Sequence, residues 1–121
     1  MDAREYLGQL RELDVKIKYK RKLIIEMDNK GVLVSSREIK KLRKQVVNDI
    51  TAYMKKRNEI IDTIYTLKKP EQIAILHAKW VDGESLEKIA DVTGYSFHTV
   101  RKAYSIAMRL IQKEVENLEK P

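Results

Sequence analysis

Residues 85–102 have the sequence SLEKIADVTGYSFHTVRK, and this stretch decides how the second half of the chain folds. Ser85 is a favoured N-cap residue, so it predicts a helix that starts at the next position and ends before Gly94. Gly94 can adopt the positive φ that a sharp turn requires. Ser96 then caps a second predicted helix over about 97–118. The stretch therefore predicts two helices joined by a three-residue turn.

The side chains around the turn indicate how these two helices cross. The small Ala90 lets the second helix approach the first, and Val100 is placed to pack into the angle between them. Ile89 and Val92 are available for burial beside them. A close crossing at a short turn is the geometry of a helix-turn-helix motif, which this spacing predicts.

The start of the second helix carries the candidate site. A helix-turn-helix places the first residues of its second helix in the major groove of DNA. The six outward-facing candidates for DNA binding are Ser96, Phe97, His98, Thr99, Arg101 and Lys102. Ser96 leaves N–H groups at the helix end that suit a phosphate. Arg101 and Lys102 can address guanine or phosphate, and Thr99 can contact either a base or a phosphate.

A further short helix is predicted before this motif. Pro70 suits the first turn of a helix and disfavours helix just before it. Asp82 and Gly83 mark the end of this helix. Four nearby side chains are expected to serve the structure rather than bind a ligand, and these are His77, Trp80, Tyr95 and Tyr104.

The first half of the chain predicts two long helices that pack as an antiparallel hairpin. Capping-box patterns start both helices, Asp2-x-x-Glu5 for the first and Ser35-x-x-Glu38 for the second. Apolar residues then recur every three or four positions along each helix. Helices of about 27 and 33 residues would be roughly 40 and 50 Å long. A short loop between them favours antiparallel packing.

Three features of this hairpin bear on its contacts. Lys20 lies near Asp49 in the antiparallel register, which predicts an ion pair. One hairpin cannot cover both apolar stripes, so we expect the second half or another copy of the chain to pack against it. The apolar segment 32–34, in the expected loop, either caps the hairpin or makes an intermolecular contact.

Charge is unevenly placed along the chain. The 121 residues hold 25 basic and 18 acidic side chains, for a net charge of +7. Residues 1–69 carry a net charge of +8 and residues 70–121 carry −1. Because phosphate contacts supply most non-specific affinity for DNA, we expect the second half alone to bind DNA weakly. The basic hairpin, a dimer or a further protein partner would supply the missing affinity, unless the domain binds protein instead.

Composition and motifs exclude several classes of protein. Without cysteine there are no disulfides, zinc ribbons or thiol nucleophiles. No apolar run reaches about 20 residues, so we expect a soluble, cytoplasmic protein without a membrane span. No phosphate-binding loop or nucleophile elbow is found, so we expect no enzyme, no catalytic residue and no cofactor. The only two histidines, His77 and His98, are 21 residues apart and there is no cysteine, so we expect no metal site.

The segment 76–102 resembles region 4 of bacterial sigma factors. The matching features are Lys79-Trp80 before Asp82-Gly83, Ser-x-x-x-Ile-Ala at 85–90, Gly94-x-Ser96 and Thr99-Val100-Arg101. The resemblance covers about residues 67–115. More loosely, the whole chain is similar to small prophage-encoded, sigma-like regulators of late-gene transcription. This resemblance implies sequence-specific binding of promoter DNA beside the bacterial nucleoid, together with contact to the host RNA polymerase.

Together these observations predict an all-α protein with a long N-terminal antiparallel hairpin and a sigma-region-4-like helix-turn-helix bundle. The expected domains are a basic hairpin over 1–69, for oligomerisation or partner contact, and a DNA-binding domain over 70–121. The expected function is transcription regulation, in particular activation of phage or prophage late genes. The expected partners are double-stranded DNA and host RNA polymerase, and a homodimer is an open alternative. Two other functions stay open: a small terminase subunit for DNA packaging, and an RNA-polymerase-binding interaction protein that reads no DNA.

Overall fold

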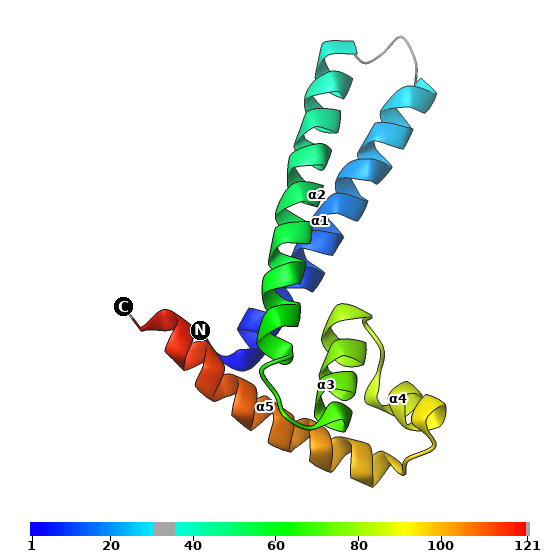
Figure 1. Cartoon of the computed structure of the whole chain (residues 1–121). Coiled ribbons are helices and arrows are strands. Elements are labelled where there is room, and N and C mark those ends of the chain that lie inside the picture. Colours follow the sequence, from blue (N-terminus) through cyan, green and yellow to red (C-terminus); the bar gives the residue numbers. More distant parts are fainter. Residues whose placement is uncertain (31–35, 121) are drawn as a thin grey trace.

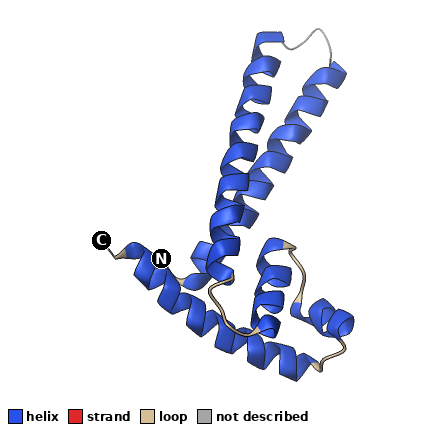
Figure 2. Cartoon of the chain, in the orientation of Figure 1, coloured by secondary structure: helices blue, strands red, loops and turns tan. Residues whose placement is uncertain are grey.

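The computed structural model describes residues 1–30 and 36–120 of the chain. Every regular element in these ranges is a helix, with no strand among them (Figure 2). The elements are α1 (Ala3–Lys30), α2 (Ser36–Ile64), α3 (Pro70–Leu76), η2 (His77–Val81), α4 (Leu86–Thr93) and α5 (Phe97–Glu119). The predicted all-α class is confirmed. None of the described helices has the length and apolar character needed to cross a membrane.

Helices α1 and α2 lie side by side and run in opposite directions, projecting away from the rest of the molecule (Figure 1). The Asp2 cap is confirmed, since its Oδ1 accepts the Glu5 N–H at 2.8 Å. The Lys20–Asp49 pair is also confirmed, with Nζ 2.7 Å from Oδ2. The predicted cap at Ser35 and the apolar segment 32–34 lie outside the described residues.

The end of α2 differs from the prediction. The apolar stripe predicts a helix as far as about Leu67, but α2 ends at Ile64. Tighter backbone turns follow, in which the Leu67 N–H donates to the Ile64 carbonyl at 3.1 Å. Leu67 is nevertheless buried, so its apolar spacing reflects packing of a turn rather than continuation of the helix.

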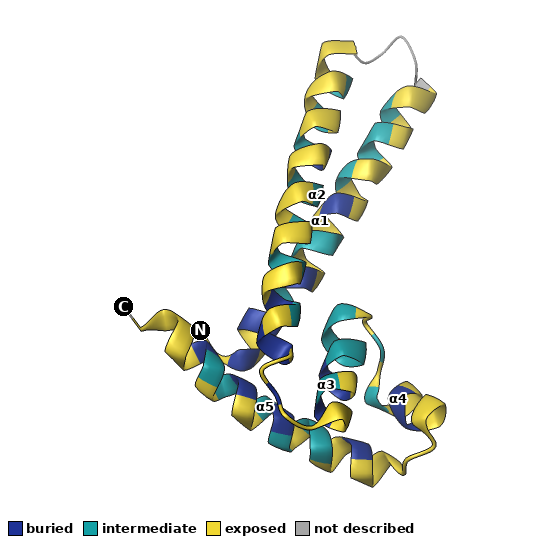
Figure 3. Ribbon diagram, viewed as in Figure 1, coloured by how far each residue is buried: buried dark blue, intermediate teal, exposed yellow. Residues whose placement is uncertain are grey.

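The main hydrophobic core lies where the base of the hairpin meets α5. Its largest fully buried members are Leu7 from α1, Ile60 and Ile64 from α2, Leu76 from α3, and Ile111 and Val115 from α5. Figure 3 shows buried residues gathered at this base, while the far end of the hairpin is mostly exposed. Residues from both sides of Pro70 thus share one core, and the boundary between the two expected domains stays a prediction.

Two polar contacts fix this junction. The Ala3 N–H donates to Gln112 Oε1 at 2.7 Å, which ties the start of α1 to α5. The Tyr6 hydroxyl lies 2.9 Å from Thr63 Oγ1, where it joins α1 to α2. The second half of the chain therefore covers the base of the hairpin, as one of the two expected packing arrangements requires.

Helix α3 continues into one turn of π-helix, η2, which the sequence pattern does not indicate. The Asp82 N–H donates to the His77 carbonyl at 3.1 Å, one residue further back than in an α-helix. Gly83 then adopts φ +75° and ends the element. Trp80, for which a structural role is expected, is half-buried and packs against the main core at the hairpin base. Its Nε1 is buried without an acceptor among the described residues.

A second, smaller core holds α3, α4 and α5 together. Its buried members are Ile75, Ile89, Ala90 and Val100. Val100 is fully buried in the angle between α4 and α5, as its spacing from Ser96 predicts. Tyr104 packs against both cores, and burial raises its pKa above the ordinary value. The predicted packing role of Tyr104 is confirmed.

Candidate nucleic-acid interface

The turn between α4 and α5 is built by local hydrogen bonds that the sequence predicts. Ser85 caps α4, with its Oγ accepting the Lys88 N–H at 3.1 Å. Gly94 ends α4 in the left-handed region at φ +78°, and its N–H donates to the Ala90 carbonyl at 3.0 Å. Ser96 caps α5, with its Oγ accepting the Thr99 N–H at 3.1 Å. These bonds fix the direction in which α5 leaves the turn.

All six predicted site residues are exposed at this end of α5. Figure 1 places the start of α5 on the side of the molecule away from the hairpin. Phe97, an apolar side chain, is 41% exposed. The turn and the second core thus support a surface on which these side chains face solvent.

The hydroxyls of Ser96 and Thr99 are joined to each other. Ser96 Oγ donates to Thr99 Oγ1 at 2.8 Å while it also accepts the Thr99 N–H. The Ser96 hydroxyl is therefore committed to the cap, whereas the Thr99 hydroxyl keeps its own proton for an outside acceptor. Thr99 is the better placed of the two for a side-chain contact to a ligand.

The first N–H groups of α5 are free donors. The cap satisfies Thr99 N–H, and the Phe97 and His98 N–H groups have no acceptor within the described residues. Such groups at a helix start carry partial positive charge and attract anions. They are the feature expected of a phosphate contact, and they lie beside exposed basic side chains.

Arg101 and Lys102 are exposed, and neither has an ion-pair partner in the part of the chain that the structure describes. Lys102 lies one helical turn after His98, and Arg101 lies one turn after Phe97. The site therefore has two adjoining faces, a basic one with an imidazole and a basic one with an aromatic ring.

Packing of α3 on α5 adds basic residues that sequence reasoning missed. A shallow depression lies where α3 packs on α5. It is lined by Lys69, Glu71, Gln72, His98, Thr99, Lys102, Ala103 and Ile106. A second depression shares Lys69, Gln72 and Ile106 with the first, and it adds Lys68 and Lys113. The sequence pattern indicates Lys68 and Lys69 only as part of the break before Pro70. Their position next to α5 follows from long-range packing, which no local pattern signals.

The first two turns of α5, residues 97–103, contain no acidic side chain, whereas α4 and the loop before it carry several. Glu87 and Asp91 are exposed on α4, and Glu84 pairs with Lys88 at 3.7 Å. The two acidic residues of α4 are thus on another helix than Arg101 and Lys102, while Glu71 of α3 lines the depression beside Lys102.

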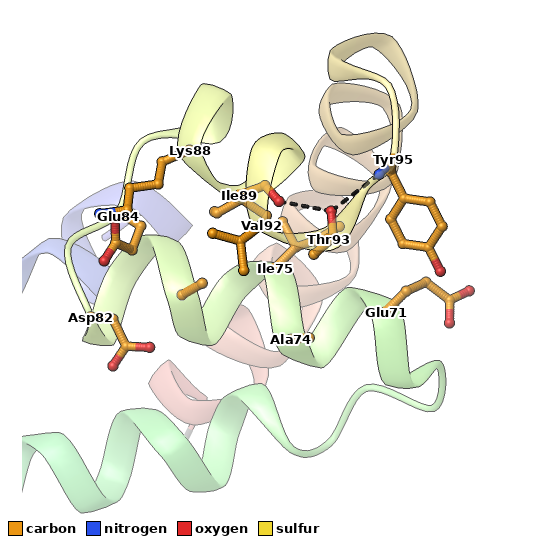
Figure 4. Close-up of a pocket in the computed structure, with 11 residues that line it drawn as sticks. Glu71, Ala74, Ile75, Asp82, Glu84, Lys88, Ile89, Val92, Thr93 and Tyr95 are labelled. Carbon is orange, nitrogen blue, oxygen red and sulfur yellow. Dashed lines mark hydrogen bonds and ion pairs between the residues drawn. The ribbon is translucent and has the colours of Figure 1, made fainter.

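An apolar pocket of about 340 Å³ lies between α3 and α4, beside the turn. Figure 4 shows Glu71 and Tyr95 at one end and Asp82, Glu84 and Lys88 at the other. Ala74, Ile75, Ala78, Ile89 and Val92 contribute apolar lining. The pocket combines an apolar lining with a mainly acidic rim, which suits a protein segment better than a phosphate.

This pocket explains the exposure of two side chains near the turn. Val92, which the sequence makes available for burial, is 74% exposed, and Tyr95, for which a structural role is expected, is 53% exposed. An eight-residue helix buries only the face that meets its neighbours, and α4 uses Ile89 and Ala90 for that contact. Val92 and Tyr95 are left at the edge of the pocket.

The groups that the start of α5 presents are hydrogen-bond donors, cations and one aromatic ring. Among the described residues, no three His, Cys, Asp or Glu side chains are grouped to hold a metal ion. His77 Nδ1 lies 3.3 Å from Asp82 Oδ2, so this side chain contributes to the η2 turn.

No protein-family model matches the chain, and neither a curated protein nor a solved structure matches it.

Proposed function

We propose that the chain is a sequence-specific, double-stranded-DNA-binding regulator of transcription. The α4–turn–α5 segment would act as a helix-turn-helix of the sigma region 4 kind, with the start of α5 in the major groove. The observation that carries this proposal is the exposed end of α5, where free N–H groups lie beside Arg101 and Lys102, both unpaired among the described residues.

Each group at this end has a separate role in the proposed complex. The Phe97 and His98 N–H groups fix one phosphate and so set the position of the helix. Arg101 or Lys102 donates to guanine in the groove, and Thr99 donates to a base or an adjacent phosphate. Phe97 contacts a thymine methyl group. Ser96 acts indirectly, because its hydroxyl holds the cap.

The regulatory setting of this proposal comes from the sequence. The resemblance to sigma region 4 supports promoter DNA as the target and host RNA polymerase as a second partner. The looser likeness to prophage-encoded regulators supports late genes as the regulated set. DNA recognition itself does not depend on either likeness and can be tested alone.

Selection from a random duplex library with the full chain tests DNA recognition. We expect a preferred site, confirmed by footprinting. Arg101→Ala with Lys102→Ala should weaken binding to it by at least about tenfold, because each good base contact contributes about 1–3 kcal/mol. Arg21→Ala with Lys22→Ala is the matched control, since these are also adjacent, exposed Arg and Lys side chains on a helix. No preferred site, or equal weakening in both variants, would contradict the proposal.

A second candidate function is protein binding through the pocket between α3 and α4. The apolar lining and the rim of Glu71, Asp82 and Glu84 favour it, because they suit a segment that is both apolar and basic. Under this alternative the chain captures RNA polymerase without reading DNA. A polymerase pull-down that persists without DNA, together with DNA binding that is weak at every salt concentration, would favour it.

A further inference from the structure

Basic side chains continue along α5 well beyond the proposed reading end. His98, Lys102, Arg109 and Lys113 are exposed and spaced four, seven and four residues apart. At 3.6 residues per turn, this spacing places all four within a sector of about 60° around the helix axis. The distance from the first to the last is about 22 Å along the axis. They form one straight row on a single face of α5.

Lys68 and Lys69 lie next to this row. Lys69 lines the depression that contains His98 and Lys102, and Lys68 lines the one that contains Lys113. Both depressions share Gln72 and Ile106, so they are parts of one continuous groove. We call Lys68, Lys69, Arg109 and Lys113 the basic strip.

The strip is free to meet an outside anion. None of its four members has an ion-pair partner in the described ranges. Two carboxylates, Glu71 and Glu114, also line the groove, so basic side chains outnumber acidic ones along it. An elongated row of cations matches the evenly spaced phosphates of a nucleic-acid strand.

We propose that the basic strip binds the phosphate backbone of the same DNA duplex that the start of α5 reads. This inference rests on the proposed function, and it assigns four residues outside the predicted site. The position of the strip favours a duplex over an acidic protein, because Lys69 lines the same depression as His98 and Lys102, and the adjoining depression shares Lys69 and adds Lys68 and Lys113. The strip would supply the non-specific affinity that residues 70–121 alone are expected to lack, because it adds Lys68 and Lys69 to the cations of α5.

The test uses Arg109→Gln with Lys113→Gln in the full chain. Both side chains are exposed, and glutamine retains good helix propensity. Fluorescence anisotropy would measure binding to the selected duplex and to a scrambled duplex between about 50 and 200 mM salt. We expect both affinities to fall by the same factor, roughly ten- to hundredfold near 0.1 M salt. The slope of log affinity against log salt should decrease by about 2, because each phosphate that is no longer neutralised removes about 0.9 from it.

Lys40→Gln with Lys44→Gln is the matched control, because these lysines are also exposed and four residues apart, but on α2. We expect an unchanged slope for this control. If wild type binds DNA and the strip variant shows the same slope of log affinity against log salt, the inference is overturned. An equal change of this slope in the strip variant and in the control variant would also overturn it. So would a strip variant that keeps its DNA affinity but no longer binds an acidic protein partner. No binding of wild type to any duplex would instead overturn the proposed function.

Discussion

The hairpin and the unit formed by α3, η2, α4 and α5 differ in how many charges they carry and in where these charges lie. Residues 1–69, which contain the hairpin and also Lys68 and Lys69 of the basic strip, hold 18 basic and 10 acidic side chains, whereas residues 70–121 hold 7 and 8. Within the described parts of the hairpin, five basic side chains form ion pairs, and these are Lys16, Lys18, Lys20, Arg43 and Lys56. On α5, by contrast, Arg101, Lys102, Arg109 and Lys113 have no such partner in the described chain.

For the proposed DNA binding, the position of the basic side chains matters more than the total net charge. By net charge alone, the hairpin is the better candidate for binding nucleic acid. By geometry, α5 is the better one, because Lys102, Arg109 and Lys113 share one face of it and adjoin a free helix N-terminus. Substitutions in the shared core, in the hairpin and in the turn test how far the two regions depend on each other.

The largest effect is expected from Ile111→Ala in the core that joins the two regions. Ile111 is fully buried there, so its truncation should lower the free energy of unfolding by about 2–5 kcal/mol. Urea unfolding followed by circular dichroism would measure this decrease. Leu110→Ala is the control, since the neighbouring side chain is 39% exposed. A hairpin that keeps its stability while α5 unfolds would show that the two regions do not share one cooperative core.

A smaller effect is expected from Asp49→Leu in the hairpin. Lys20 and Asp49 are only 18% and 14% exposed, and their atoms lie 2.7 Å apart. Removing the carboxylate leaves the ammonium group of Lys20 without its partner, so we expect a decrease of about 1–3 kcal/mol in unfolding free energy. Adding Lys20→Met should restore most of it. If the Asp49→Leu variant is as stable as wild type, the Lys20–Asp49 pair contributes no more to stability than a solvent-exposed ion pair does.

Gly94→Ala should have a smaller effect on stability but a selective effect on DNA binding. An alanine Cβ would meet no atom within 4 Å, so the cost is that of φ +78° alone, about 1–2 kcal/mol. Gly83→Ala is the matched control, because Gly83 has φ +75° and equally open space. Both variants should be destabilised to a similar extent in thermal unfolding, but only Gly94→Ala should weaken binding to the selected duplex. Equal weakening by both would argue that the α4–α5 turn does not orient the site.

Local structure is the part of the fold that can be predicted from sequence. The caps at Ser85 and Ser96 and the turn at Gly94 depend on neighbouring residues, and all three are confirmed. The Lys20–Asp49 pair is predictable because two straight antiparallel helices fix their register over a long distance.

Long-range packing is the part that cannot be predicted in this way. The π-helical turn of η2 places Trp80 against the hairpin base, and no spacing in the sequence signals that turn. For the same reason, sequence reasoning misses the groove that brings Lys69 beside Lys102. The six candidate residues at the start of α5 are exposed as expected, while their contact with DNA stays a prediction.

The most direct test of the central claim is a map of backbone amide chemical shifts, recorded by NMR on the isotope-labelled full chain with and without the selected duplex. We predict the largest changes at the Phe97 and His98 amides, where the free N–H groups would meet a phosphate. Smaller chemical-shift changes are expected at the amides of Lys102, Arg109 and Lys113 on α5. Largest changes on the hairpin, or around the pocket between α3 and α4, would contradict the account.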